Sequence, residues 1–343
     1  MRSSERDGNL LWLDNLRVTS TVCVILLHVS APLVSKFAKI PYSVWWPANI
    51  IDGGIRFCVP VFVMITGALL LRREEDHIHF LKRRLFRVVL PFLFWTAIYI
   101  EFDIWLFKRK LSAFEVAGHS VAKLVNGASY HLWYIYMILG LYLFIPMIGR
   151  WIRRASEKEI LYFLAVWGIS LLLWPQLPKM NSKLMYFSEY IGYLVLGYYL
   201  SVRSIENSTR SLAIWLGVLT VVSSITIFGT YLVSNTQHLF SPIFYSYLSL
   251  NVAVAAGTVF LLFRCTRVQN PVISSIRNFI SRYSYGIYLA HVVVLFFLNK
   301  NGINGYWHGP AIGIPATALI CLAISGTLIF LLNKLPYGKY IGG

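Results

Sequence analysis

The chain has few charged residues, since only 13% of its 343 residues are Asp, Glu, Lys or Arg, and just 14 are acidic. This scarcity excludes the charged surface of an ordinary soluble domain, in which about a quarter of residues are charged. Cysteine is also scarce. The four cysteines are scattered through apolar segments with neither metal-ligand spacing nor a disulfide framework: Cys23, Cys58, Cys265 and Cys321. No internal repeat is evident, which disfavours the inverted-repeat transporter folds.

Long apolar runs are abundant instead, and 57% of the chain is hydrophobic. Runs of about 20 apolar residues predict membrane-spanning helices, whereas porin-type strands would alternate over about ten residues. We therefore expect an all-α, polytopic membrane protein in which residues 1–343 form a single integral-membrane domain. Ten spans are predicted near residues 14–35, 47–71, 86–107, 130–148, 159–175, 186–201, 211–233, 243–263, 281–299 and 311–333.

The net charge of +17 is distributed unevenly between the two sides of this predicted topology. The side that carries both termini and the even-numbered loops holds twenty of the 31 basic residues, the other side holds nine, and Arg17 and Arg56 lie within spans. The positive-inside rule then places both termini in the cytoplasm. The basic excess indicates topology and contact with lipid headgroups of the bilayer, and no nucleic-acid partner is predicted.

Two ionisable residues, Arg17 and His28, lie in the first predicted span. Ionisable side chains are costly within a bilayer and mark a functional site by default. Eleven residues correspond to three helical turns plus roughly 20°, so the two side chains share a face, about 16 Å apart along the axis. We predict an arginine near one membrane face and an imidazole well inside, although a single intramembrane histidine also serves as a buried hydrogen-bonding residue.

Asp52 and Arg56 are four residues apart in the second predicted span, the spacing of an ion pair on one helix face. Asp52 is expected at the depth of His28, which makes it a candidate catalytic partner. The pair can equally be structural, because an unpaired charge at that depth is costly.

Other polar residues are expected at two levels of the membrane. Arg84 and Arg87, one turn apart at the start of the third span, are predicted to face the bundle at its cytoplasmic end. Toward the outer half, Ser284, Tyr288 and His291 share one helix face. The remaining candidates near the outer face are His131, Trp133 and Glu189. His131 is either an acceptor-site residue or an interfacial anchor, and the adjacent Trp133 favours the anchor. The pattern predicts a site with two mouths.

These residues belong to motifs through which the chain resembles the integral-membrane acyltransferase-3 family over almost its whole length. The motifs are Trp12-Leu-Asp-Asn-Leu-Arg17 followed by His28; Arg56-Phe-Cys-Val-Pro-Val-Phe-Val-Met-Ile-Thr-Gly67; Arg84-Leu-Phe-Arg87; His131-Leu-Trp133; and Ser284-Tyr-Gly-Ile-Tyr-Leu-Ala-His291. The nearest likeness is to stand-alone bacterial O-acetyltransferases of surface polysaccharides, including the enterobacterial common antigen type. Asp52 departs from this pattern, since close relatives have Asn at its position.

The resemblance implies a multi-pass enzyme of the bacterial inner membrane that uses acyl-CoA, expected to be acetyl-CoA, from the cytoplasm. The acceptor would be a hydroxyl of a glycan or lipid-linked sugar on the periplasmic side. His28, Arg17 and Asp52 are then the catalytic candidates, and Arg17, Arg84 and Arg87 are the candidates for binding the CoA phosphates. The acceptor site is expected to use Arg56, His131, Trp133, Glu189, Ser284, Tyr288 and His291.

The chemistry agrees with this assignment, because a neutral imidazole can take the proton of a hydroxyl that attacks a thioester. A thiolate leaves readily, so no metal is required, and no metal-ligand cluster is seen in the sequence. The sequence leaves open the sugar, the length of the acyl group or a succinyl donor, an acyl-histidine intermediate, and a homo-oligomer. A polysaccharide or lipid exporter is the main alternative, and a non-catalytic subunit of a glycan-synthesis complex is a third.

Overall fold

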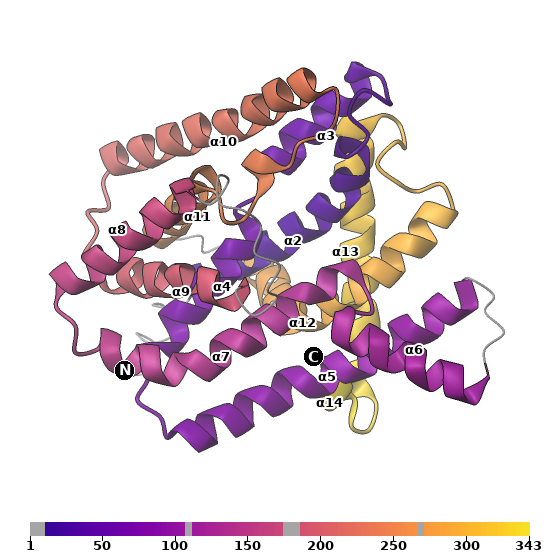
Figure 1. The fold of residues 1–343 in the computed structure, drawn as a ribbon, viewed down its shortest axis with the longest axis horizontal. Helices are drawn as coiled ribbons and strands as arrows, with labels where there is room; N and C mark the ends of the chain where they lie inside the picture. The colour runs from indigo at the N-terminus through magenta and orange to yellow at the C-terminus, as the bar shows by residue number, and fades with distance from the viewer. Residues whose placement is uncertain (1–10, 107–111, 174–185, 267–270) are drawn as a thin grey trace.

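The computed structural model describes residues 11–106, 112–173, 186–266 and 271–343, and the regular elements within these ranges are all helical (Figure 1). The α-helices are α2 (Leu11–Val34), α3 (Tyr42–Gly54), α4 (Cys58–Leu70), α5 (His77–Leu106), α6 (Ala113–Asn126), α7 (Trp133–Ile152), α8 (Glu157–Leu173), α9 (Tyr186–Val202), α10 (Thr209–Gln237), α11 (Leu250–Cys265), α12 (Pro271–Lys300), α13 (Pro310–Lys334) and α14 (Gly338–Ile341). Two short 3₁₀ turns, η1 (Tyr130–Leu132) and η4 (Ile243–Tyr245), precede α7 and α11.

The all-α, polytopic fold class is confirmed. Eight segments of the described residues are long and apolar enough to cross a membrane, with α3 and α4 together forming one of them. The two further predicted spans coincide with α8 and α9, which have 17 residues each and flank residues 174–185, outside the described ranges. The count of ten spans therefore stays a prediction.

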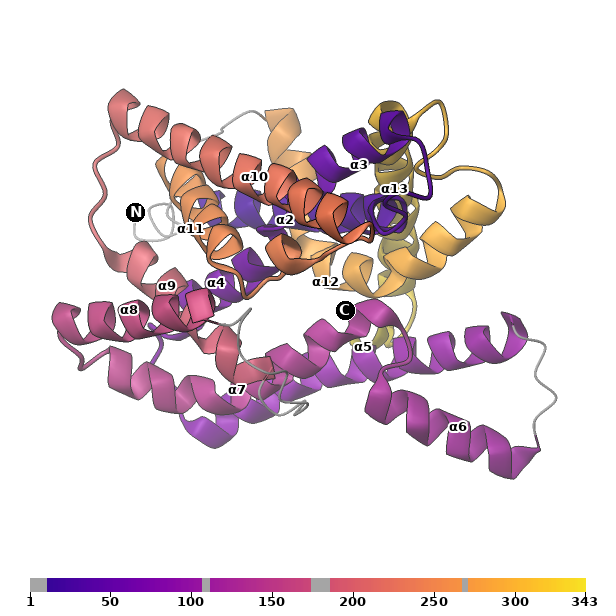
Figure 2. The same ribbon diagram turned by 45° about the horizontal axis from the view of Figure 1, so that its top comes forward.

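Helix α2 lies in the middle of the bundle, with α3 and α10 on one side and α12 and α5 on the other (Figures 1 and 2). It packs against α12, α3, α13, α4 and α11. Half of its residues are buried, among them Leu16, Ile25 and Ser30. The helix that carries Arg17 and His28 is consequently enclosed by protein on most sides, as an ionisable residue at membrane depth requires.

The predicted second span is not one continuous helix. Its chain leaves the helical conformation over residues 55–57, between α3 and α4, so Arg56 lies in a turn rather than one helical turn below Asp52. Gly53 and Gly54 precede the break and Pro60 follows it, and these residue types weaken a helix or remove its hydrogen bonds. Non-helical backbone at membrane depth is tolerated where protein surrounds it.

Helices α5 and α12 begin before the apolar runs that predicted them. The spans were expected from residues 86 and 281, whereas the helices start at His77 and Pro271. Hydropathy detects only the apolar part of a helix, and the polar first turns of α5 and α12 continue the same helices. This extension means that Arg84 is two turns inside α5, on a regular helix rather than in a loop.

Helices α4 and α9 approach each other closely at two glycines, Gly67 and Gly197. A Cβ atom built on Gly67 would lie 2.0 Å from the Leu194 carbonyl oxygen, and one on Gly197 would lie 2.1 Å from the Met64 carbonyl oxygen. Small residues at such crossings allow two membrane helices to pack backbone against backbone. This contact fixes α4, which forms one wall of the site described below.

The segment between the third and fourth predicted spans forms α6. Its N-terminus is fixed by a capping box, in which Ser112 and Glu115 bond to each other's backbone and side chain. His119 and Lys123 attach the helix to Asp103 of α5, at 3.0 Å each. The helix lies at the edge of the bundle, alongside the end of α5 (Figure 1).

Candidate active site

A cavity of about 310 Å³ lies within the bundle. Its lining comes from α2, α4, α5, η1, α7 and α12, together with Tyr247 of the segment that connects η4 to α11. Basic side chains border one part of the cavity and histidines another, while aliphatic and aromatic residues form the wall between them. The two mouths that the sequence predicted for this site stay a prediction.

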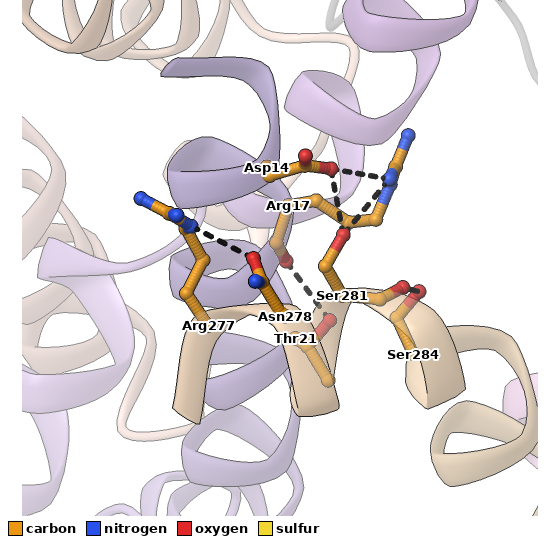
Figure 3. A network of polar contacts seen from close by, with 7 residues as sticks. All are labelled: Asp14, Arg17, Thr21, Arg277, Asn278, Ser281 and Ser284. Atoms are coloured by element: carbon orange, nitrogen blue, oxygen red, sulfur yellow. Dashed lines mark hydrogen bonds and ion pairs between the residues drawn. The ribbon is translucent and has the colours of Figure 1, made fainter. Parts of the chain in front are cut away.

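Three arginines border the cavity: Arg17, Arg84 and Arg87. The Arg17 Nη1 atom donates to Asp14 Oδ1 at 2.9 Å and to Ser281 Oγ at 3.0 Å, and Ser281 Oγ donates to the same carboxylate oxygen at 2.7 Å (Figure 3). This network joins α2 to α12 and orients Arg17 through a single nitrogen. The other guanidinium nitrogens of Arg17 have no partner among the contacts of the described residues.

Arg84 and Arg87 reach the cavity from α5, next to Tyr142 of α7. The Arg84 Nε atom is buried without a hydrogen-bond partner in the described structure. An arginine donor that no protein acceptor occupies is available to a ligand in the cavity. Arginine matches a phosphate oxygen with two parallel hydrogen bonds, and this end of the cavity is therefore suited to an anionic phosphate group.

Three imidazoles gather at the other part of the site. The ring centroids of His28 and His291 are 5.1 Å apart in a stacked arrangement, and His131 lies 5.1 Å from His291 and 6.4 Å from His28. His28 and His131 line the cavity, whereas His291 is fully buried behind them. His28 is half-buried, and no hydrogen bond to its ring occurs among the described residues. Its ring is therefore the one most free to meet a ligand.

The hydrogen bond of His291 fixes the tautomer of its neutral ring. The Nδ1 atom lies 2.6 Å from the Tyr288 carbonyl oxygen, and a carbonyl can only accept. Nδ1 must carry the proton, so Nε2 has a lone pair, and this atom is buried without a partner in the described structure. His291 can accept a hydrogen bond beside His28 but, in this state, cannot donate one from Nε2.

His131 is held by residues on either side of it. Its Nδ1 atom lies 3.0 Å from Ser129 Oγ, and its carbonyl oxygen accepts a hydrogen bond from the Tyr288 hydroxyl. The Nε2 atom of His131 is buried and has no partner among the described residues. His131 is 1% exposed and lines the cavity, so it faces inward, whereas the adjacent Trp133 had favoured an interfacial anchor.

Asp52 and Arg56 form an ion pair across the break between α3 and α4. Asp52 also accepts a hydrogen bond from Ser30 Oγ at 3.0 Å, and the Arg56 guanidinium lies 4.1 Å from the centroid of the Tyr245 ring. Neither charged residue lines the cavity, and the contacts described for Asp52 do not include His28. The geometry favours the structural interpretation of the pair over a catalytic partnership.

Aromatic rings close the cavity on the side of α7 and α9. Trp133 and Tyr247 both line it and stack with centroids 5.8 Å apart and planes 22° from parallel. Trp133 also contacts Tyr190 of α9. A flat aromatic wall of this kind can pack against the apolar face of a ring-shaped ligand.

The structure brings together most of the residues that the sequence proposed. Those that line the cavity are Arg17, His28, Arg84, Arg87, His131, Trp133, Ser284 and Tyr288, and His291 contacts three of them: His28, His131 and Tyr288. Asp52, Arg56 and Glu189 lie outside the lining. Sequence reasoning did not single out Asp14, which lies within the quoted Trp12–Arg17 motif, or Ser281, three residues before Ser284. It also missed Tyr142 and Tyr247, which carry no sequence signal of their own.

No group of three or more His, Cys, Asp or Glu residues with metal-binding geometry occurs within the described ranges. Comparison with known proteins gives one finding: a family model described as "Acyltransferase domain" matches residues 10–331. Searches of curated proteins and of solved structures give no match. The matched segment contains every residue that lines the cavity.

Proposed function

Because this chain belongs to the integral-membrane acyltransferase-3 family, we propose that it moves an acyl group from cytoplasmic acyl-CoA to a hydroxyl of a surface-polysaccharide or lipid-linked sugar. One observation carries the proposal: a single cavity is bordered by three arginines in one part and by His28 and His131 in another. Phosphate-binding groups and a proton acceptor are the two requirements of acyl transfer from CoA to a hydroxyl.

In this proposal Arg84, Arg87 and Arg17 bind the phosphates of CoA, and the free Arg84 Nε atom is an available donor. Tyr142 lies beside the arginines, and the apolar wall of Val24, Val59 and Phe62 accommodates the uncharged pantetheine arm. We take the acyl group to be acetyl and the membrane to be the bacterial inner membrane, with the arginine end facing the cytoplasm.

His28 acts as the general base. The acceptor hydroxyl oxygen attacks the thioester carbonyl carbon while its proton passes to the neutral imidazole of His28. The carbon–sulfur bond then breaks, and the departing CoA thiolate takes the proton back from the imidazolium. His131 and His291 position the acceptor, His131 from the cavity wall and His291 from behind His28.

The decisive experiment measures release of free CoA thiol by purified protein supplied with acetyl-CoA and a glycan extract. We expect His28→Gln to lower the rate by about 10²–10⁴-fold, the usual contribution of a general base. Folded yield and acetyl-CoA binding should stay close to wild type. His79→Gln, at an exposed position of α5 outside the cavity lining, is the matched control.

Turnover by His28→Gln within a few-fold of wild type would remove His28 from the mechanism. The exporter alternative predicts a different result, namely glycan movement across proteoliposomes with no thiol release by the wild-type protein. Mass spectrometry of surface glycans from a deletion strain and its parent identifies the acyl group and the sugar, because only the parent should carry the modification.

A further inference from the structure

A second hollow, here called the α8 groove, opens between α8, α9 and α11, with a volume of about 290 Å³. Its lining is almost wholly apolar: Leu164, Trp167, Gly168, Leu196, Leu200, Leu250, Ala253, Val254, Gly257, Thr258 and Leu261. Thr258 contributes the only side-chain hydroxyl of this lining, and that hydroxyl donates to the Val254 carbonyl oxygen at 2.7 Å. The groove therefore offers no free polar group and suits a hydrocarbon chain.

The α8 groove adjoins the candidate active site through a row of aromatic rings. Trp133 of the cavity contacts Tyr190, with centroids 6.0 Å apart, and Tyr190 contacts Tyr193 at 6.0 Å. Tyr193 contacts Trp167 of the groove at 4.8 Å, and its hydroxyl donates to the Tyr247 carbonyl oxygen. Tyr247 lines the cavity, and three residues later Leu250 lines the groove.

The direction of the groove follows from its residues on α11. Leu250 lies at the start of this helix, the outer end in the predicted topology, and Leu261 lies about 16 Å farther along at about 1.5 Å per residue. At the inner end, Arg264 donates to the Leu200 carbonyl oxygen and Arg72 to the Ser201 carbonyl oxygen. These arginines are engaged with the C-terminal turn of α9, so the outer end, beside Tyr247, is the natural entrance.

We propose that the α8 groove binds the hydrocarbon chain of a lipid-linked acceptor while the sugar of that acceptor occupies the cavity beside Trp133 and His28. This inference rests on the proposed function. An apolar groove gains little over bulk lipid from hydrophobicity alone, because lipid tails are equally apolar. A sugar and a chain that are covalently joined bind two adjoining sites at once, which raises the effective concentration of each part at its own site.

The test uses photo-crosslinking of purified protein in nanodiscs with a sugar-bearing isoprenyl diphosphate that carries a diazirine on its chain. We expect crosslinks on peptides containing Leu164, Trp167 and Val254, and we expect an excess of the same sugar-bearing lipid without the diazirine to remove them. The same mole fraction of phosphatidylglycerol should leave the crosslinks in place. Equal displacement by phosphatidylglycerol would identify ordinary bilayer lipid as the occupant and overturn the proposal, as would crosslinks elsewhere only.

Two glycines give a matched pair of variants, because a Cβ on either would meet nothing within 4 Å. Gly168→Leu fills the α8 groove, whereas Gly217→Leu adds the same atoms to the exposed surface of α10. Crosslinking should fall several-fold in the first variant and stay at the wild-type level in the second. If Gly168→Leu lowers folded yield, Leu164→Trp fills the same space. Unchanged crosslinking in a folded groove-filled variant would refute the proposal.

Thiol release from acetyl-CoA, measured on the same preparations, separates this inference from the proposed function. A protein that releases thiol with a water-soluble sugar acceptor but shows no groove crosslinks would retain the acyltransferase proposal and lose the α8 groove. Groove crosslinks without thiol release would support lipid binding in the α8 groove and contradict the acyltransferase proposal. When both hold, Gly168→Leu should raise KM for a lipid-linked acceptor and leave KM for the soluble acceptor unchanged.

Discussion

At the residue scale, the site combines one accessible imidazole with two that are fixed in place. His131 and His291 are each tied to a neighbour through Nδ1, while His28 borders the cavity without a hydrogen bond among the described residues. A ring that accepts a proton and then returns it needs one nitrogen that no protein group occupies. The two fixed rings restrict the position of His28 by contact, since one stacks on it and the other meets it at an angle.

Binding of acetyl-CoA is predicted to depend on Arg84 more than on the adjacent Arg83. Arg84→Ala should weaken acetyl-CoA binding by on the order of 1–3 kcal/mol, the scale of a hydrogen bond to a charged group. Arg84→Lys should restore only part of this, because the planar fork is lost. Isothermal titration calorimetry of the purified variants measures the effect.

Arg83 provides the control for this measurement. It has the same charge, lies outside the cavity lining and is paired with Glu75. Arg83→Ala should therefore bind acetyl-CoA like the wild type. Equal losses in the Arg83 and Arg84 variants would mean that net charge, rather than a defined site, attracts the donor.

Asp52 and Arg56 are predicted to stabilise each other. Breaking a buried ion pair by removing one partner costs about 3–5 kcal/mol, while removing both partners is milder. Asp52→Asn and Arg56→Gln should each lower the thermal stability strongly, and the double variant should recover part of the loss. Fluorescence-detected thermal unfolding of the four proteins completes the double-mutant cycle.

Turnover of the same four proteins separates stability from catalysis. If Asp52 only pairs with Arg56, folded Asp52→Asn protein should retain transfer activity when the rate is expressed per folded molecule. Additive stability losses together with abolished turnover would instead make Asp52 a partner of His28.

At the element scale, the sequence pattern predicted well which residues share a helix face, but it predicted poorly where helices begin or break. Arg17 and His28 share a face of α2 and border one cavity, as their spacing required. The break at residues 55–57 was missed because mean hydropathy over a span-length window stays high around it, although Gly53, Gly54 and Pro60 are local signs of a weakened helix. The early starts of α5 and α12 were missed because the first turns of these helices are too polar to be recognised as membrane segments.

The crossing of α4 and α9 is predicted to tolerate no side chain at Gly67. Its added Cβ would meet a backbone carbonyl oxygen of α9, which cannot rotate away as a side chain could. Overpacking of this kind costs about 1–3 kcal/mol, so Gly67→Ala should lower the melting temperature of the purified protein. Gly217→Ala adds the same methyl group to open space on α10 and should melt at or above the wild-type temperature. A Gly67→Ala protein as stable as Gly217→Ala would contradict this contact.

At the scale of the whole molecule, the cavity depends on segments that are far apart in sequence. Arg17 and Ser284 reach it from opposite ends of the chain, and Tyr247 comes from a turn between η4 and α11. The sequence indicated which helix faces were polar, and that was enough to predict every arginine and histidine that lines the cavity, but not most of its apolar and aromatic lining. It could not indicate how the helices are ordered around α2, so the aromatic wall and the separation of Asp52 from the cavity became apparent only in the folded chain.

The predicted topology has both termini in the cytoplasm and α8 crossing the membrane, and cysteine accessibility tests both points. The four native cysteines are buried, so background labelling by a membrane-impermeant maleimide should be low. Lys36 and Leu173 are exposed at the outer ends of α2 and α8 in this topology, and Asn207 is exposed between α9 and α10 on the inner side. In intact cells we expect Lys36→Cys and Leu173→Cys to be labelled and Asn207→Cys to be protected until the membrane is permeabilised.

Labelling of Asn207→Cys from outside would mean that the true topology is the reverse of the predicted one, with the arginine end of the cavity facing away from cytoplasmic acyl-CoA. Protection of Leu173→Cys alone would leave the orientation intact and show that α8 enters the membrane without crossing it.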